Sequence, residues 1–158
     1  MLGGVDRQEP DVDELRDALV QMSFGLAAML TEVAARHDLS LTQLRMLGIL
    51  RDREPTVAEL SVGLGLERST VSGLIDRAVQ RDLVLKATDP IDGRAVRVRL
   101  SPHAHTVAQD VLSQIGERMA PSIGRLSVVE RKRLTTLLTK MAGPGHLAQC
   151  NQVSSMVG

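Results

Sequence analysis

Small hydroxyl groups, a glycine and arginines gather on one face of residues 68–81. As a helix, this segment turns by about 100° per residue, which places one apolar stripe against a core: Val71, Leu74, Ile75, Ala78 and Val79. The opposite face, its edges and the helix start carry Arg68, Ser69, Thr70, Ser72, Gly73, Asp76, Arg77 and Gln80. Hydroxyls suit phosphates or bases, and arginine suits guanine or phosphate, so this face favours close approach to nucleic acid. Gly73 either weakens the helix or lets its backbone approach a groove wall.

A shorter helix and a tight turn precede this face. Thr56 and Glu59 form a T-x-x-E capping box, which satisfies the free amides of a helix start. Gly65 can take the left-handed conformation that a sharp exit from this helix needs. The pattern predicts a helix-turn-helix with its second helix in the major groove of DNA, and we place Thr56 on the DNA-facing side.

Two strand-like runs follow, at residues 83–88 and 95–100. The second run alternates, with Val96, Val98 and Leu100 on one face and Arg97 and Arg99 on the other. Asp92-Gly93 between the runs is a hairpin signal, because glycine supplies the positive φ that such turns require. The segment therefore predicts a two-stranded wing attached directly to the second helix.

Charged residues of the wing have two interpretations each. Arg94 at the tip either solvates a hairpin turn or reaches into the minor groove, where narrow A·T-rich stretches attract arginine. Asp92 would orient Arg94 or the hairpin backbone. Asp76 is unfavourable beside phosphates unless it is paired, and Arg77 or a wing arginine is the expected partner.

These segments together resemble the MarR family of winged helix-turn-helix regulators over about residues 11–141. The most specific motifs are Ser69-Thr70-Val71-Ser72, Leu74-Ile75-Asp76-Arg77, Asp92-Gly93-Arg94 and Val98-Arg99-Leu100-Ser101. The chain differs where Gly93 replaces a second basic residue and where His103-Ala104-His105 replaces a segment with glycine. The resemblance implies an intertwined homodimer and a cleft that small aromatic or phenolic ligands can enter. The apolar residues at positions 15–33 are the expected lining of that cleft.

Composition narrows the class of partner. The chain has 158 residues with 19 basic and 19 acidic side chains, which argues against a polybasic binder that ignores sequence. It has no Trp or Tyr and one Phe, so stacking on single strands is poorly supported and double-stranded DNA is the better partner. One cysteine excludes an internal disulfide framework. We expect no apolar run near the roughly 18 residues of a membrane span and no signal peptide, hence a cytoplasmic protein.

Helices are expected on both sides of the winged segment. A D-x-x-E start at Asp11 opens a long apolar helix to about residue 36, and Ser40-Leu41-Thr42-Gln43 is a capping box for the next. Ser101-Pro102 starts a helix that Pro121 ends or bends, and Ser127 to Glu130 caps another that stops at Gly143-Pro144-Gly145. We expect a dimerisation region at residues 11–38 and 102–143, a winged helix-turn-helix at 39–101 and a flexible tail at 144–158.

The predicted fold is mainly α with a small two-stranded β wing and flanking dimerisation helices. The predicted function is a sequence-specific DNA-binding transcriptional regulator, most simply a repressor that binds a pseudo-palindrome as a homodimer. The alternative is a winged domain used for protein contacts. No nucleophile, phosphate loop or metal spacing indicates an enzyme or a cofactor. His103 and His105 lie on different helix faces, so a metal site with His37 is a minor alternative, as is a redox role for Cys150.

Overall fold

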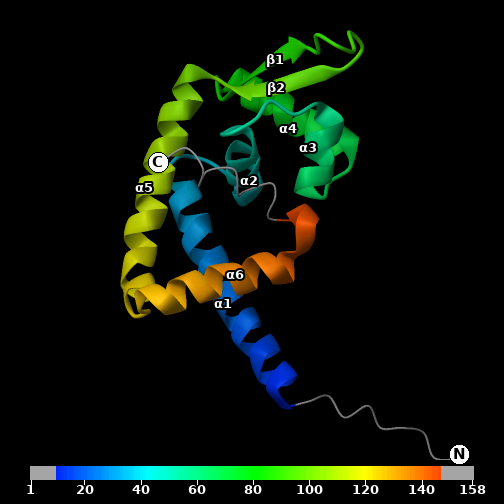
Figure 1. Ribbon diagram of the computed structural model, residues 1–158. Helices are drawn as coiled ribbons and strands as arrows, with labels where there is room; N and C mark the ends of the chain where they lie inside the picture. Colours follow the sequence, from blue (N-terminus) through cyan, green and yellow to red (C-terminus); the bar gives the residue numbers. More distant parts are fainter. Residues whose placement is uncertain (1–9, 147–158) are drawn as a thin grey trace, which may run out of the picture.

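The computed structural model describes residues 10–146, which form helices and one two-stranded antiparallel sheet (Figure 1). The elements are α1 (Pro10–Ala35), α2 (Leu41–Leu50), α3 (Val57–Leu64), α4 (Arg68–Gln80), β1 (Val84–Thr88), β2 (Val96–Leu100), α5 (Pro102–Gly124) and α6 (Val128–His146). The predicted fold class, mainly α with a small β wing, is confirmed. We call α2 to β2 the winged unit, and α1, α5 and α6 the helical frame.

The winged unit contains most of the hydrophobic core. Fully buried side chains come from each of its elements: Met46, Leu47, Leu60, Val71, Ile75, Val84 and Val98. In the sheet, Val84 pairs with Leu100 and Thr88 with Val96, so the two strands are antiparallel and β2 leads back to α5. Alternation of β2 thus puts Val98 and Leu100 on the core, whereas Val96 at the outer end is exposed.

Local sequence signals start and end the helices as expected. Ser40 and Gln43 cap α2, and Thr56 and Glu59 cap α3, each pair through reciprocal backbone hydrogen bonds of 2.7–3.2 Å. Gly65 ends α3 with φ 67°, in the left-handed region. Gly143 has φ 69° and interrupts α6 near its end.

The helical frame is long and largely exposed. In Figure 1, α5 runs from the wing down to α6, which overlaps the middle of α1 in this view, and the start of α1 lies furthest from the wing. The Arg118 guanidinium of α5 pairs with the Glu32 carboxylate of α1 and holds the pKa of Glu32 below its usual value. No described side chain of α6 from Val128 to Met141 is buried.

Three expectations for the frame and for α4 were wrong. The helix α1 already includes Pro10, so Asp11 lies in its first turn rather than at its cap. Pro121 does not end α5, which continues to Gly124, although its ring removes one backbone donor there; a bend at Pro121 stays a prediction. Val79, in the last turn of α4, is exposed rather than buried.

The expectation about apolar runs was also wrong. Residues 11–35 of α1 are long and apolar enough to cross a membrane, with mean hydropathy 1.5 over an 18-residue window. Alanine, glycine and uncharged polar residues interrupt the run of large apolar side chains in this segment. Glu32 is nevertheless the only charged residue between positions 18 and 35. A helix that packs in a soluble core passes the same test, so length and composition alone are weak support for a membrane span.

A corner between α1 and α2 ties α4 to the frame. Asp38 takes a positive φ of 54° at this corner. The Arg81 guanidinium, just after α4, donates to the Asp38 carbonyl at 2.7 Å and to the His37 carbonyl at 3.5 Å. The His37 ring lies 3.1 Å from the Gln114 amide nitrogen of α5. The corner therefore contacts α4 and α5 at once.

Candidate nucleic-acid interface

The polar face of α4 is open to solvent. Its apolar face packs Val71, Leu74, Ile75 and Ala78 into the core, which turns the predicted contact residues outward. Arg68, Ser69, Thr70, Ser72 and Arg77 are all exposed. The Ser72 hydroxyl donates to the Arg68 carbonyl at 3.0 Å, whereas the hydroxyls of Ser69 and Thr70 have no hydrogen-bond partner among residues 10–146. The face thus offers two uncommitted hydroxyls in the first turn of a helix.

Gly73 is half-buried at the centre of this face. A Cβ built at this position would meet only the Arg77 guanidinium, at 3.5 Å from Nη1. That distance is ordinary van der Waals contact, so the fold of this chain does not itself require glycine there.

Asp76 is paired, but with a residue that the sequence did not suggest. Its carboxylate binds the Lys86 ammonium of β1 at 2.5 Å. The prediction that Arg77 or a wing arginine pairs with Asp76 was wrong. Lys86 lies on β1 and reaches Asp76, whereas the wing arginines lie in the tip and on β2. The pair removes a bare negative charge from the polar face of α4.

Thr56 lies at the base of the wing rather than on the polar face of α4. Its hydroxyl is engaged in the α3 cap, accepting from the Glu59 amide and donating to the Glu59 carboxylate at 3.0 Å. The Thr56 amide, which donates to that carboxylate at 2.7 Å, and then the Thr56 hydroxyl lower the pKa of Glu59. The Thr56 backbone pairs with Arg97. A cavity of about 370 Å³ connects Thr56 with Arg68 and with Asp92 of the wing. The structure therefore brings three predicted residues from three elements around one groove.

The wing tip is organised by a buried carboxylate, Asp89, which sequence reasoning missed. Asp89 is only 5% exposed. One of its oxygens accepts from the Ile91 amide at 2.7 Å and from the Asp92 amide at 3.0 Å. The other accepts from Arg97 Nε at 2.5 Å. The Asp92 and Ile91 amides, together with the Arg97 guanidinium, hold the pKa of Asp89 below its ordinary value.

The tip is therefore not the glycine-dependent turn that Asp92-Gly93 suggested. Gly93 does not have a positive φ. The Asp92 side chain accepts from the Arg94 amide at 3.0 Å, and its carbonyl accepts from the Ala95 amide at 2.9 Å. Of the two roles expected for Asp92, orientation of the hairpin backbone is the one observed. An aspartate directly before proline at a strand end was the available signal, since Asp-Pro initiates turns.

Arg97 fixes the wing to the rest of the winged unit. Besides binding Asp89, its guanidinium donates to the Glu54 carbonyl at 2.7 Å, and the Val98 amide donates to the Pro55 carbonyl at 2.9 Å. These bonds join β2 to the loop between α2 and α3. The wing is consequently held against the start of α3 as well as by its own strands.

Two arginines of the wing are left over for other partners. Arg94 and Arg99 are exposed, and the side chain of neither makes a hydrogen bond or ion pair with the described residues. Lys86 and Arg97 neutralise acidic residues, so the free positive charge of the wing is concentrated at Arg94 and Arg99.

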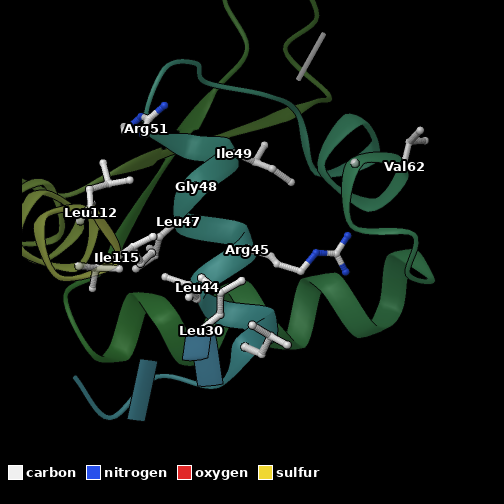
Figure 2. A pocket seen from close by; sticks show the side chains of 14 residues that line it. Leu30, Leu44, Arg45, Leu47, Gly48, Ile49, Arg51, Val62, Leu112 and Ile115 are labelled. Atoms are coloured by element: carbon white, nitrogen blue, oxygen red, sulfur yellow. The ribbon is translucent and has the colours of Figure 1, made fainter. Parts of the chain in front are cut away.

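An apolar cavity of about 640 Å³ lies between the winged unit and the frame. Figure 2 shows α2 as its floor, with Leu112 and Ile115 of α5 on one side and Val62 of α3 on the other. Arg45 and Arg51 are its charged lining residues. Residues 15–33 were expected to line it, but α1 contributes only Leu30, because the apolar residues nearer the start of α1 are exposed.

Comparisons with known proteins agree on one family. The profile of the MarR family matches residues 37–95, which run from the α1–α2 corner through the wing tip. The HTH-type transcriptional regulator MgrA of Staphylococcus aureus is 32% identical over 111 residues, covering 70% of this chain and 74% of the relative. The chain belongs to the MarR family. Its family is one of transcriptional regulators, which are generally not enzymes.

Solved structures of MarR-family proteins share the fold of most of the chain. NadR in complex with 4-hydroxyphenylacetate aligns with a TM-score of 0.73 at 16% identity, covering 91% of this chain and 99% of that protein. A mutant of MarR from E. coli complexed with operator DNA aligns with a TM-score of 0.66 at 21% identity, covering 83% and 95%. At these identities the likeness concerns the winged helix fold.

The remaining candidate chemistry of this MarR-family chain lies apart from the α4 face. His103 and His105 are exposed on α5, whereas His37 approaches Asp110 and Gln114 further along that helix. In the part of the chain that the structure describes, no three His, Cys, Asp or Glu side chains are grouped to hold a metal ion. Cys150 lies outside the described residues.

Proposed function

We propose that this cytoplasmic MarR-family protein is a repressor that binds a pseudo-palindromic DNA operator as a homodimer. The observation that carries the proposal is the open face of α4, with the uncommitted hydroxyls of Ser69 and Thr70 and the exposed arginines Arg68 and Arg77. A helix of this kind after a tight turn is the element that reads the major groove in helix-turn-helix proteins. A structural relative, MarR from E. coli, has been crystallised as a mutant with operator DNA.

The wing would act at the neighbouring minor groove. Arg94 stands free at its tip, on a loop held by Asp89 and Asp92. Narrow minor grooves carry an enhanced negative potential, which attracts arginine. The chain has no net charge, so this local cation and the α4 face, rather than bulk charge, would supply the attraction.

The homodimer would form through the helical frame. Leu134, Leu137, Leu138 and Met141 of α6 recur at helical spacing and are exposed, as are Leu15, Met22 and Phe24 of α1. A second copy related by a two-fold axis would cover these faces, since most soluble oligomers are cyclic dimers. Two α4 helices on one side of a duplex would then meet half-sites about 10 base pairs apart.

The test separates the two DNA-reading elements by their dependence on salt and sequence. Operator duplexes would first be selected from a random library by the wild-type protein. Arg94→Ala should then weaken binding broadly and flatten the salt dependence by about one counterion per subunit. Ser69→Ala or Arg77→Ala should instead relax preference at particular half-site bases, each by about 1–3 kcal/mol if the contact is to a base edge.

Failure to select any duplex would reject DNA as the partner of the α4 face. An Arg94→Ala protein with the wild-type affinity and salt slope would remove the wing from DNA recognition and leave α4 alone. Gly73→Ala is a useful companion, because the fold tolerates a methyl group there. It should retain its thermal stability yet bind operator more weakly if α4 approaches the groove wall at this point.

A small aromatic or phenolic ligand in the apolar cavity would release the repressor. The cavity lies between α2 and α5, so a ligand that prefers another angle between winged unit and frame would shift the dimer away from the DNA-binding spacing. NadR, a structural relative, was crystallised with 4-hydroxyphenylacetate. A thermal-shift screen of such acids and phenols should find compounds that stabilise the protein and weaken operator binding. Compounds that bind tightly without changing operator affinity would contradict this.

A further inference from the structure

Ile91 at the wing tip is the most exposed large apolar side chain among the described residues. It is 91% exposed, although isoleucine is normally among the most buried residue types. The wing tip lies at one end of the molecule, away from α6 and from the start of α1 (Figure 1). A second copy that paired through the frame would therefore leave Ile91 uncovered.

The loop presents Ile91 in a fixed position without using its side chain. The Ile91 amide donates to the buried Asp89 carboxylate at 2.7 Å, and that carboxylate is held by Arg97. Pro90, the preceding residue, has its φ restricted by its ring. Backbone bonds thus order the loop, and the isoleucine side chain projects from it into solvent.

Arg94 shares this short loop. Its amide is bound by the Asp92 carboxylate, and the Asp92 amide is bound by the same Asp89 oxygen that binds Ile91. A cation and an apolar group are therefore displayed together on one ordered tip. A groove that attracts the Arg94 guanidinium would also draw in the short loop that carries Ile91.

We propose that Ile91 is a specificity-determining residue, which packs into the minor groove beside Arg94 and excludes guanine at the positions flanking each half-site. The inference rests on the proposed function and goes beyond it. The minor-groove edge of an A·T pair presents acceptors only, whereas a G·C pair adds the guanine N2 amino group. An isoleucine side chain can neither bind that donor nor leave room for water to do so.

Arg94 and Ile91 would favour A·T pairs in different ways. Arg94 responds to groove width and negative potential, so its contribution depends on charge and on salt. Ile91 carries no charge, so its contribution should depend on apolar contact area and on whether the amino group is present, and it should leave the salt slope unchanged. The two contributions can therefore be separated with a base analogue.

The experiment uses the full-length protein and duplexes selected by it, with the flanking A·T pairs replaced by G·C or by inosine·C. Inosine lacks the N2 amino group but keeps the major-groove edge of guanine. Wild-type protein should bind the G·C duplex more weakly and recover on the inosine duplex. Ile91→Ala should bind the original duplex about 10- to 30-fold more weakly over two wings, because apolar contact area is lost. It should also discriminate less between guanine and inosine, with the salt slope of the wild type.

Val129→Ala is the control, because Val129 is also an exposed aliphatic side chain, 74% accessible. It lies near the start of α6, away from the wing, and is not one of the α6 residues assigned to the dimer face. Val129→Ala should change neither affinity nor discrimination. If Ile91→Ala keeps the wild-type affinity and the wild-type ratio of guanine to inosine binding, the inference is overturned while DNA binding stands. If the wild-type protein selects no duplex, the proposed function fails first. Equal thermal stability of both variants would exclude misfolding as the cause.

Discussion

The winged unit and the helical frame differ in how completely they bury their apolar side chains. In the winged unit, every helix and strand contributes to one core, and its largest side chains, such as Met46 and Ile75, are fully buried. In the frame, Phe24 of α1 is 68% exposed and α6 has no buried side chain between Val128 and Met141. The two regions have similarly apolar helices, so the difference lies in the partners available within one chain.

This contrast separates what the single chain completes from what it leaves to assembly. The winged unit has capped helices, a paired sheet and a wing fixed through Arg97. The frame exposes large apolar side chains at helical spacing on α6, such as Leu134, Leu137 and Met141, and contiguous exposed apolar side chains often mark an interaction site. The winged unit should therefore respond to mutation as an ordinary core, and the frame as an interface.

The largest effect is expected from a charge on the α6 stripe. Leu137→Asp should dissociate the dimer, because a carboxylate cannot be buried against a second apolar helix. Operator affinity should fall by about 100-fold or more, since two linked α4 helices would no longer bind together. Light scattering and fluorescence anisotropy measure the two results. Thr136→Asp, on the other face of α6, is the control, and a Leu137→Asp protein that stays dimeric would contradict the proposed interface.

A core truncation in the winged unit should have a large effect of another kind. Ile75→Ala removes a fully buried side chain of α4 and should lower the free energy of unfolding by about 2–5 kcal/mol. Val62→Ala, at an exposed position of α3, should change it by less than about 0.5 kcal/mol. Urea denaturation at one fixed protein concentration compares them. Equal destabilisation by both variants would mean that Ile75 is packed less tightly in the core than its buried surface indicates.

The wing tip should show the smallest effect on global stability and a specific dependence on pH. Because the pKa of Asp89 is lowered in the folded state, its stabilisation of the tip is present above the ordinary aspartate value of 3.8. It should be lost as the pH falls through the lowered value. Amide hydrogen exchange should show Ile91 and Asp92 losing protection in that range, while α4 stays protected.

Asp89→Ala should reproduce the acid state of the tip at neutral pH, with faster exchange of the same two amides and weaker operator binding. Asp89→Asn keeps an acceptor for those amides but loses the charge that pairs with Arg97. Its amide exchange rates and its operator affinity should lie between those of Asp89→Ala and those of the wild type. Protection of Ile91 that is unchanged in Asp89→Ala would show that the strands alone order the tip.

Sequence reasoning succeeded where a local signal sets the structure. Capping pairs such as Thr56 and Glu59, the left-handed Gly65 and the apolar stripe of α4 all depend on residues a few positions apart. All were found, except that Val79 does not belong to the buried stripe. The outward direction of Ser69, Thr70 and Arg77 followed from the stripe. Their contacts with DNA remain predictions.

It failed where the partner is distant or where several local solutions compete. The pairing of Asp76 with Lys86 depends on how β1 passes α4, which no spacing reveals. Asp92-Gly93 suggested a tight turn, but two aspartate side chains bind the loop amides and make a positive φ unnecessary. The prediction assigned too much of the cavity lining to α1. This helix is apolar on more than one face, so periodicity alone could not distinguish the face toward α2 from the exposed face.

The way in which Asp89 holds the wing tip also bears on how such a regulator can diverge. Asp89 binds backbone amides, which every residue other than proline supplies, so the shape of the loop is indifferent to the side chain at position 91. Substitutions at position 91 should therefore not lower the stability of the protein, whereas most substitutions at ordered positions do. If Ile91 contacts DNA as proposed, duplicated copies of the gene could acquire separate target sites by single substitutions at the tip, while α4 and the core remained the same.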